Sequence, residues 1–303
     1  MSRVIRSSFP SGDGRCAAWL TVPDGAPPFP AVVLIHGFGA THEMALPKYE
    51  EKFSKAGLAV VSFDYRRLGA SPGEPRQKMR VKDLLKDADS ALNWAQSQAE
   101  IDGTRVALWG TSFGASHAMV TAARRKDVAA VALNCPMING FNASTRLGLG
   151  HIARVFWPIT VDVTRSVLGL SPRHLPLVVE PGEFGMINVE GARAGWYSII
   201  PEGEKWDNRV NAGIALDVAT YRASSYAARI GCPLLVCVSE RENLMDPQIA
   251  VRAAKTAPKG RAIHYDADHF DVYHAPHFER IAGDQTEFLR AALKVDAPAR
   301  EAA

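Results

Sequence analysis

Apolar residues in the first 136 positions alternate between short continuous runs and segments with helical spacing. Continuous runs rich in β-branched residues occur at AVVLIHG (31–37), LAVVSFDYR (58–66), RVALWG (105–110) and DVAAVALNCP (127–136). Such runs are typical of strands buried on both faces of a parallel sheet. Helical spacing occurs between them, at residues 46–57, 80–98 and 113–125. The alternation predicts an α/β sheet with right-handed crossovers and helices on both faces.

The same pattern defines the ends of the chain and an interruption between them. VIRSSF (4–9) and RCAAWLTVP (15–23), separated by the turn-forming PSGDG, predict an N-terminal hairpin. The alternation breaks near 137 and resumes near 230 with strands at 233–240 and 261–267 and helices at 247–258 and 276–294. We therefore expect a core of residues 1–136 and 229–303 and an inserted, largely helical cap of residues 137–228. Within the cap, helices are expected at 143–156 and 206–230.

Composition narrows the classes of function. The net charge is +3, with 35 Lys and Arg against 32 Asp and Glu interspersed along the chain, so we expect no nucleic-acid partner. The N-terminus lacks a signal-peptide core and no apolar run reaches membrane-spanning length, which predicts a cytoplasmic protein without membrane association.

The four cysteines form no CxxC pair and are expected to be buried thiols. Neither a metal-binding pattern such as HExxH nor a phosphate loop occurs, so no metal and no cofactor is expected. The oligomeric state is not readable.

One short segment carries candidate chemistry. Gly110-Thr111-Ser112-Phe113-Gly114 matches G-x-S-x-G and lies between a predicted strand and a predicted helix. A strand that turns at once into a helix crowds the corner residue, and glycines leave room for the close approach of the backbone. The pattern predicts that the Ser112 hydroxyl is exposed above the sheet and acts as a nucleophile, although a solvated turn serine gives the same five letters.

A serine nucleophile needs a histidine base, and the base needs a carboxylate to orient it. On such a turn the acid and the histidine follow in chain order, after later strands. His269 follows the last predicted strand, and Glu242 follows the strand before it, with Asp246 as the rival acid. The main-chain N–H groups of Phe113 and of Phe38, in the turn HGFG, are the expected oxyanion donors.

Five segments in order, HGFGATHEM, FDYRRLGASPGEP, VALWGTSFGASH, LLVCVSERENL and DADHFDVY, resemble the α/β-hydrolase superfamily. The resemblance is closest to bacterial capped serine hydrolases related to serine aminopeptidases and dienelactone hydrolases. It implies the fold, a cap and a Ser–acid–His triad in a protein that acts on a small-molecule ester or acyl substrate. The chain departs from the family pattern at Glu242, where aspartate is usual, and at Ala115, where a second glycine is common. Asp64 and Arg66 are read as structural residues at a strand end.

Three functions remain open at this point. The first is a serine hydrolase that cleaves a carboxylic ester or thioester through an acyl-enzyme, with the cap selecting the substrate. The second is a C–C bond hydrolase or an acyltransferase with the same triad. The third is a catalytically silent relative that binds a ligand. Aromatic residues of the cap either line an acyl pocket or pack the cap onto the core: Phe156, Trp157, Trp196, Tyr197 and Trp206.

Overall fold

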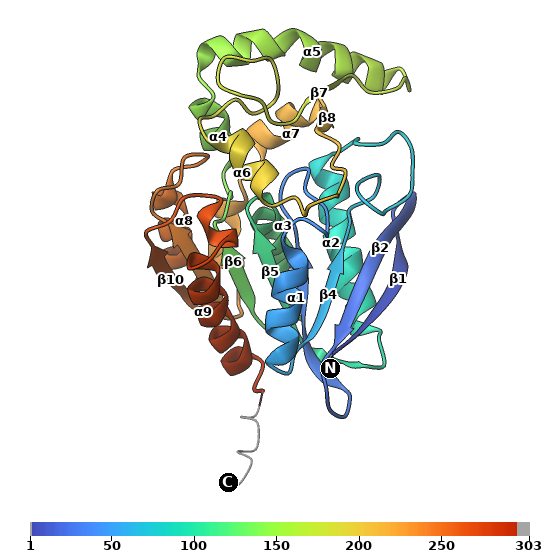
Figure 1. Cartoon of the computed structure of the whole chain (residues 1–303), viewed down its shortest axis with the longest axis vertical. Helices are drawn as coiled ribbons and strands as arrows, with labels where there is room; N and C mark the ends of the chain where they lie inside the picture. Colours follow the sequence, from blue (N-terminus) through green and yellow to red (C-terminus); the bar gives the residue numbers. More distant parts are fainter. Residues whose placement is uncertain (1, 296–303) are drawn as a thin grey trace.

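The computed structural model describes residues 2–295, and its largest element is one eight-stranded sheet (Figure 1). In spatial order the strands are β1 (Arg3–Ser11), β2 (Gly14–Val22), β4 (Ala59–Phe63), β3 (Phe29–Ile35), β5 (Ile101–Thr111), β6 (Val131–Asn134), β9 (Leu234–Ser239) and β10 (Gly260–Tyr265). β2 pairs antiparallel with β1 and with β4, and all other neighbours are parallel. The predicted α/β fold with a mostly parallel sheet is confirmed.

Helices cover both faces of this sheet (Figure 1). One face carries α1 (Leu46–Lys55) and α9 (His277–Ala292), which contact each other, and the opposite face carries α2 (Val81–Gln96), α3 (Phe113–Arg124) and α8 (Pro247–Thr256). Each of these helices follows a predicted helical segment closely. No helix between residues 2 and 295 is both long enough and apolar enough to cross a membrane.

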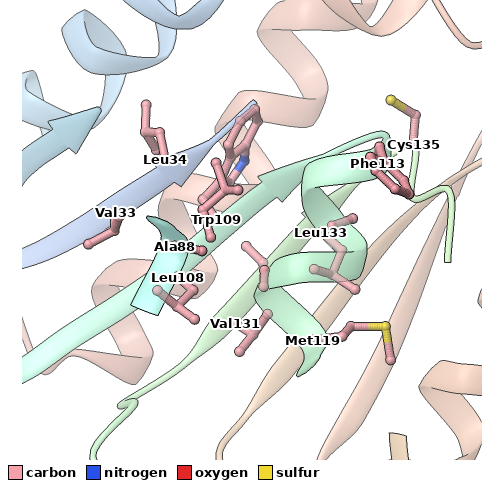
Figure 2. Packing of buried hydrophobic residues seen from close by; sticks show 14 of the residues in the cluster. Val33, Leu34, Ala88, Leu108, Trp109, Phe113, Met119, Val131, Leu133 and Cys135 are labelled. Carbon is pink, nitrogen blue, oxygen red and sulfur yellow. The ribbon is translucent and has the colours of Figure 1, made fainter. Parts of the chain in front are cut away.

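The centre of the sheet is buried on both faces, as the continuous apolar runs predict. Figure 2 shows Leu108 and Trp109 of β5 packed among side chains of the neighbouring strands and α3. Trp109 is fully buried, and its indole N–H donates to Gln285 Oε1 at 2.8 Å. Dense packing of this kind fixes the positions of the strand ends to which the functional loops are attached.

The segment between β6 and β9 lies outside the sheet and covers the edge formed by the carboxyl ends of the parallel strands (Figure 1). We refer to residues 137–228 as the cap, the boundaries proposed from the sequence. Its elements are α4 (Gly140–Arg146), α5 (Leu149–Val167), β7 (His174–Pro176), α6 (Ala192–Ser198), β8 (Arg209–Asn211), α7 (Ile214–Thr220) and the 3₁₀ helix η1 (Ala223–Arg229).

Two helix predictions in the cap are wrong in detail. The helix expected at 143–156 is divided between α4 and α5 at Gly148, whose φ of 80° interrupts the helical backbone. α5 then continues to Val167. The helix expected at 206–230 contains β8, α7 and η1, because β8 pairs with β7 in a small antiparallel sheet. That pairing is a tertiary interaction, which the helical spacing of one segment does not reveal.

Candidate active site

Ser112 lies at the corner between β5 and α3, with φ 53° and ψ −121°. Its main-chain N–H donates to Asn134 O on β6 at 3.0 Å. A Cβ at Gly114 would lie 2.1 Å from the carbonyl oxygen of Ile35, and one at Gly110 would lie 2.6 Å from Gly114 O. Both glycines are therefore required for this turn, which is the steric reason behind the sequence pattern.

The structure brings the three predicted side chains together. His269 Nε2 lies 3.0 Å from Ser112 Oγ, and His269 Nδ1 lies 2.6 Å from Glu242 Oε2. The carboxylate accepts only, so the Nδ1–H donates to it, and Nε2 is left to accept the proton of the serine hydroxyl. The side chains of His269 and Glu242 are 3% and 6% exposed, so their contact is largely shielded from water.

The loops after β9 and β10 are joined to each other, and this places the acid beside the base. Arg241 N–H donates to Ala267 O at 3.0 Å, one residue before Glu242 and two before His269. The second carboxylate oxygen, Glu242 Oε1, accepts the main-chain N–H of Leu244 at 2.8 Å. Both carboxylate oxygens are thus engaged, which fixes the direction from which Glu242 reaches the imidazole.

A tight turn holds the histidine. The carboxylate of Asp268 accepts the main-chain N–H groups of Phe270 and Asp271 at 2.7 and 2.8 Å, while Asp268 N–H donates to Asp271 Oδ2 at 2.9 Å. These bonds enclose His269 on both sides in sequence. The backbone around His269 is therefore fixed by hydrogen bonds within its own loop.

The rival acid has another role. Asp246 is the N-cap of α8, and its carboxylate accepts the main-chain N–H of Gln248 at 2.9 Å. Aspartate is favoured at this position because it satisfies a free N–H of the first helical turn. The structure thus places Glu242, and not Asp246, against the imidazole.

The two residues expected to supply the oxyanion donors lie beside the serine. A Cβ at Gly37 would lie 3.2 Å from Ser112 Cβ, so the loop after β3 passes directly beside the hydroxyl. The rings of Phe38 and Phe113 meet edge to face with centroids 5.4 Å apart. The cap holds this loop from above, since the indole N–H of Trp206 donates to Gly39 O at 2.8 Å.

A buried polar cluster behind the serine is not apparent from the sequence. Thr111 Oγ1 is hydrogen-bonded to the hydroxyl of Tyr273, four residues after His269, and also accepts from Asn134 Nδ2 at 3.3 Å. Asn134 Oδ1 in turn accepts from Gln285 Nε2 at 3.1 Å. The cluster connects β5, which leads into Ser112, to the loop that carries His269. Single polar residues inside apolar strands carry no pattern by which they could be found.

Two further histidines lie below the site and are neutral. Burial lowers the pKa of His36 to about 4 and that of His117 to about 3. His36 Nδ1–H donates to Gly37 O at 3.1 Å, and His117 Nδ1–H donates to the hydroxyl of Tyr221 at 3.1 Å. His36 therefore supports the loop beside Ser112, and His117 is a packed core residue.

Asp64 and Arg66 have the structural role expected of them. Asp64 Oδ1 accepts the main-chain N–H of His42 at 2.6 Å, and burial raises the pKa of Asp64 to about 6. Arg66 Nε lies 2.6 Å from Asp87 Oδ1 on α2. Both side chains tie the loop after β4 to neighbouring elements.

Ser112 stands between two compartments. The larger encloses about 680 Å³ of atom-free space, part of it open to solvent, and its walls are almost entirely apolar. They include Ala143 of α4 and Leu147 just after it, Met186, Val189, Trp196 of α6 and Val218 of α7. The smaller, of about 360 Å³, is lined by His269 together with His36, Met44 and Tyr273. Because His269 borders only the smaller compartment, the two sides of the serine differ chemically.

The aromatic residues of the cap fall into three groups: one lines the compartments, one binds the loop after β3, and the rest are exposed to solvent. Trp196 borders both compartments, and Trp206 binds the loop after β3. Phe156 and Trp157, in contrast, are 65% and 71% exposed, so they neither line the pocket nor pack the cap onto the core. Tyr197 is also exposed. Among residues 2–295 no group of three or more His, Cys, Asp or Glu side chains is placed to hold a metal ion.

Comparison with known proteins adds to this geometry. A family model described as serine aminopeptidase, S33, matches residues 26–281. The quorum-quenching protein AidA of Acinetobacter baumannii is 34% identical over 287 residues, which is 95% of this chain and 94% of that protein. A thiohydrolase of Eupenicillium brefeldianum is 31% identical over 269 residues, 86% of each chain.

Solved structures share the fold. DcsB in complex with a substrate analogue superimposes with a TM-score of 0.82 at 20% identity, covering 96% of this chain and 100% of that one. The α/β hydrolase GrgF from Penicillium superimposes with the same TM-score at 20% identity, covering 96% of this chain and 99% of that one. At this level of identity the likeness bears on the fold.

Proposed function

Because the chain belongs to the serine aminopeptidase S33 family of α/β hydrolases, we propose that it hydrolyses a carboxylic ester or thioester through an acyl-enzyme on Ser112. The observation that carries the proposal is the continuous contact from hydroxyl to imidazole to carboxylate beneath an apolar pocket. A silent ligand-binding relative would be expected to lack one of these groups. A carboxylate nucleophile, which alkyl-enzyme chemistry requires, is not at position 112.

In the acylation step Ser112 Oγ attacks the carbonyl carbon while its proton passes to His269 Nε2. Glu242 stabilises the imidazolium that forms and keeps Nδ1–H directed toward itself. The carbonyl oxygen becomes an oxyanion, which the N–H groups of Phe38 and Phe113 stabilise. The bond from carbon to the leaving oxygen or sulfur then breaks, and His269 returns the proton to the leaving group.

The position of His269 sets the direction of the substrate. A general acid must lie beside the atom that it protonates, so the leaving group occupies the smaller compartment that His269 borders. The acyl chain then extends into the larger apolar compartment under the cap. In the second step a water in the leaving-group position attacks the acyl carbon, with His269 as general base, and releases the free acid.

The same intermediate permits acyl transfer. If an alcohol, thiol or amine fills the smaller compartment in place of water, deacylation yields a new ester, thioester or amide. Relatives such as polyketide transferase af380 of Aspergillus fumigatus, 29% identical over 57% of this chain, favour keeping this second candidate. C–C bond hydrolysis is a third use of the same triad.

The test is a panel of p-nitrophenyl esters and acyl thioesters of increasing chain length, with Ser112→Ala as the control. We expect turnover that rises with chain length as the apolar pocket fills, at about 0.8 kcal/mol per buried methylene until the pocket is full. Product analysis with added alcohols or amines separates hydrolysis from transfer. No turnover across the panel, or full turnover by Ser112→Ala, would contradict the proposal.

A further inference from the structure

The outer face of α5 is apolar and uncovered. α5 lies along the top of the cap, far from the sheet (Figure 1). Leu149 and Val167 at its two ends are 85% and 82% exposed, and Phe156 and Trp157 near its middle are 65% and 71% exposed. We call the following set the α5 outer stripe: Leu149, Ile152, Phe156, Trp157, Val163, Val167 and Leu168.

The stripe contains no charge. The three charged residues of α5 are Arg154, Asp162 and Arg165, and each is engaged within the cap. Arg154 Nη1 donates to Gly182 O at 2.9 Å and Arg165 Nε donates to Ser171 O at 2.6 Å. Asp162 is buried. The outer face does carry the exposed hydroxyls of Thr160 and Thr164, which donate to carbonyl groups of α5 itself, but no charged side chain.

The stripe is large enough for a stable interface. Its exposed fractions correspond to apolar surface on the order of 800 Å², about what each partner contributes to a protein–protein interface of standard size. Single exposed apolar residues are common on soluble proteins, but a contiguous patch of this area is a mark of a binding surface.

We propose that two copies of this chain associate through the α5 outer stripe, antiparallel and related by a two-fold axis near position 158. Leu149 and Val167, the two most exposed residues of the stripe, lie nine positions on either side of that point, so each would face the other across the axis, and Phe156 would face Thr160. A two-fold interface requires a patch that complements itself, and an uncharged apolar stripe does so without repulsion between like charges.

The charge of the cap favours a second copy over a charged partner. Residues 137–228 contain eight Lys and Arg and eight Asp and Glu, so the cap has no net charge. It offers no electrostatic attraction to an anionic lipid surface or to a strongly charged protein. The interface leaves the triad untouched, since Ser112 lies on the other side of the cap helices, and the inference is independent of the proposed reaction.

Sedimentation velocity of the full chain over a wide range of concentration tests the proposal. The wild type is expected to be a dimer. Phe156→Lys and Val167→Lys each place a charge in the stripe and are expected to raise the dimer dissociation constant at least about thirtyfold, with unchanged melting temperature. Val4→Lys, at an exposed apolar position on β1, is the matched control and stays dimeric.

Cross-linking checks the register. Thr160 is exposed close to the proposed axis, so Thr160→Cys in a Cys232→Ser background is expected to give a covalent dimer with a short bismaleimide. Cys232→Ser alone, with Cys16, Cys135 and Cys237 buried, does not. A wild type that stays monomeric, or a dimer that both stripe substitutions leave intact, overturns the proposal. Flotation of a monomer with neutral phosphatidylcholine vesicles, lost in Phe156→Lys, also overturns it and assigns the stripe to a lipid surface.

Discussion

The turn around Ser112 and the outer surface of the cap differ in how closely the backbone is packed. At Gly114 the backbone of β3 is so close that one added carbon would lie 2.1 Å from Ile35 O, whereas nothing lies within 4 Å of a Cβ at Gly150 or Gly191 in the cap. The backbone around Ser112 is thus closely packed, whereas Gly150 and Gly191 lie on open surface of the cap. Where the cap packs internally it is as close, since a Cβ at Gly140 would lie 1.8 Å from Val218 O. The comparison thus separates a turn where backbone atoms exclude even one added carbon from surface positions of the cap where an added carbon meets nothing.

The largest effect is expected from substituting the two candidate acids one at a time. Glu242→Gln removes the charge that stabilises the imidazolium and should lower kcat by about 10⁴-fold, the size of effect known for such a change in a serine triad. Asp246→Asn is the matched control, the same loss of a carboxylate. Asparagine still caps a helix, so activity and stability should hardly change. Steady-state kinetics and thermal melts decide, and the reverse order of effects would reject Glu242 as the acid.

A pair of glycine substitutions tests the contrast in packing directly. Gly114→Ala forces backbone atoms apart and should lower the free energy of unfolding by about 4 kcal/mol or more. Gly150→Ala, in α5 with open space around it, should leave stability unchanged or raise it by up to about 1 kcal/mol. Urea denaturation measures both. Equal changes in the free energy of unfolding at the two positions would show that they do not differ in packing.

The dense region should also show a distinct pH dependence. The pKa of His117 is lowered to about 3 by burial, so its contribution to stability is present above about pH 6.5 and is lost as the pH falls, because the unfolded chain takes up the proton. Between about pH 7.5 and 5.0 this amounts to about 2 kcal/mol. His117→Gln should lose correspondingly less stability over that interval than the wild type. Identical pH dependence of the two proteins would show that His117 is not a buried neutral group.

The smallest effect is expected from a substitution in the cap. Ala143→Leu fills part of the larger compartment and should lower kcat/KM for long acyl chains about tenfold while short chains are little affected. Ala194→Leu, the same change at an exposed position of α6, should leave the chain-length profile unaltered. If Ala143→Leu reduced activity on all chain lengths equally, the acyl chain would not extend under α4.

The sequence predicts the core better than the cap, for a physical reason. Buried strands and the G-x-S-x-G turn are local consequences of composition and sterics, so Ser112 and His269 are found from pattern and chain order. In the cap, Phe156 ends a predicted helix and Trp157 follows it, but helical spacing does not tell which face of a helix another element covers. The break at Gly148 and the pairing of β7 with β8 depend on contacts between distant segments.

The contact between Tyr273 and Thr111 behind the nucleophile could not be predicted either. A threonine inside a strand and a tyrosine in a loop have no spacing relation, and their contact exists only because β5 and the loop after β10 meet at one edge. The choice between Glu242 and Asp246 likewise needed the structure. Both carboxylates follow β9. Only the structure shows that the side chain of Glu242 points to the imidazole while that of Asp246 caps α8.

The nucleophilic role of Ser112 is tested most directly by a covalent label. The protein is treated with a fluorophosphonate, and the adduct is located by mass spectrometry of its peptides, with Ser112→Ala as the control. One adduct per chain on Ser112, absent from Ser112→Ala and strongly reduced in His269→Ala, is the predicted result. Labelling of another residue, or none in protein that still turns over esters, would contradict the account.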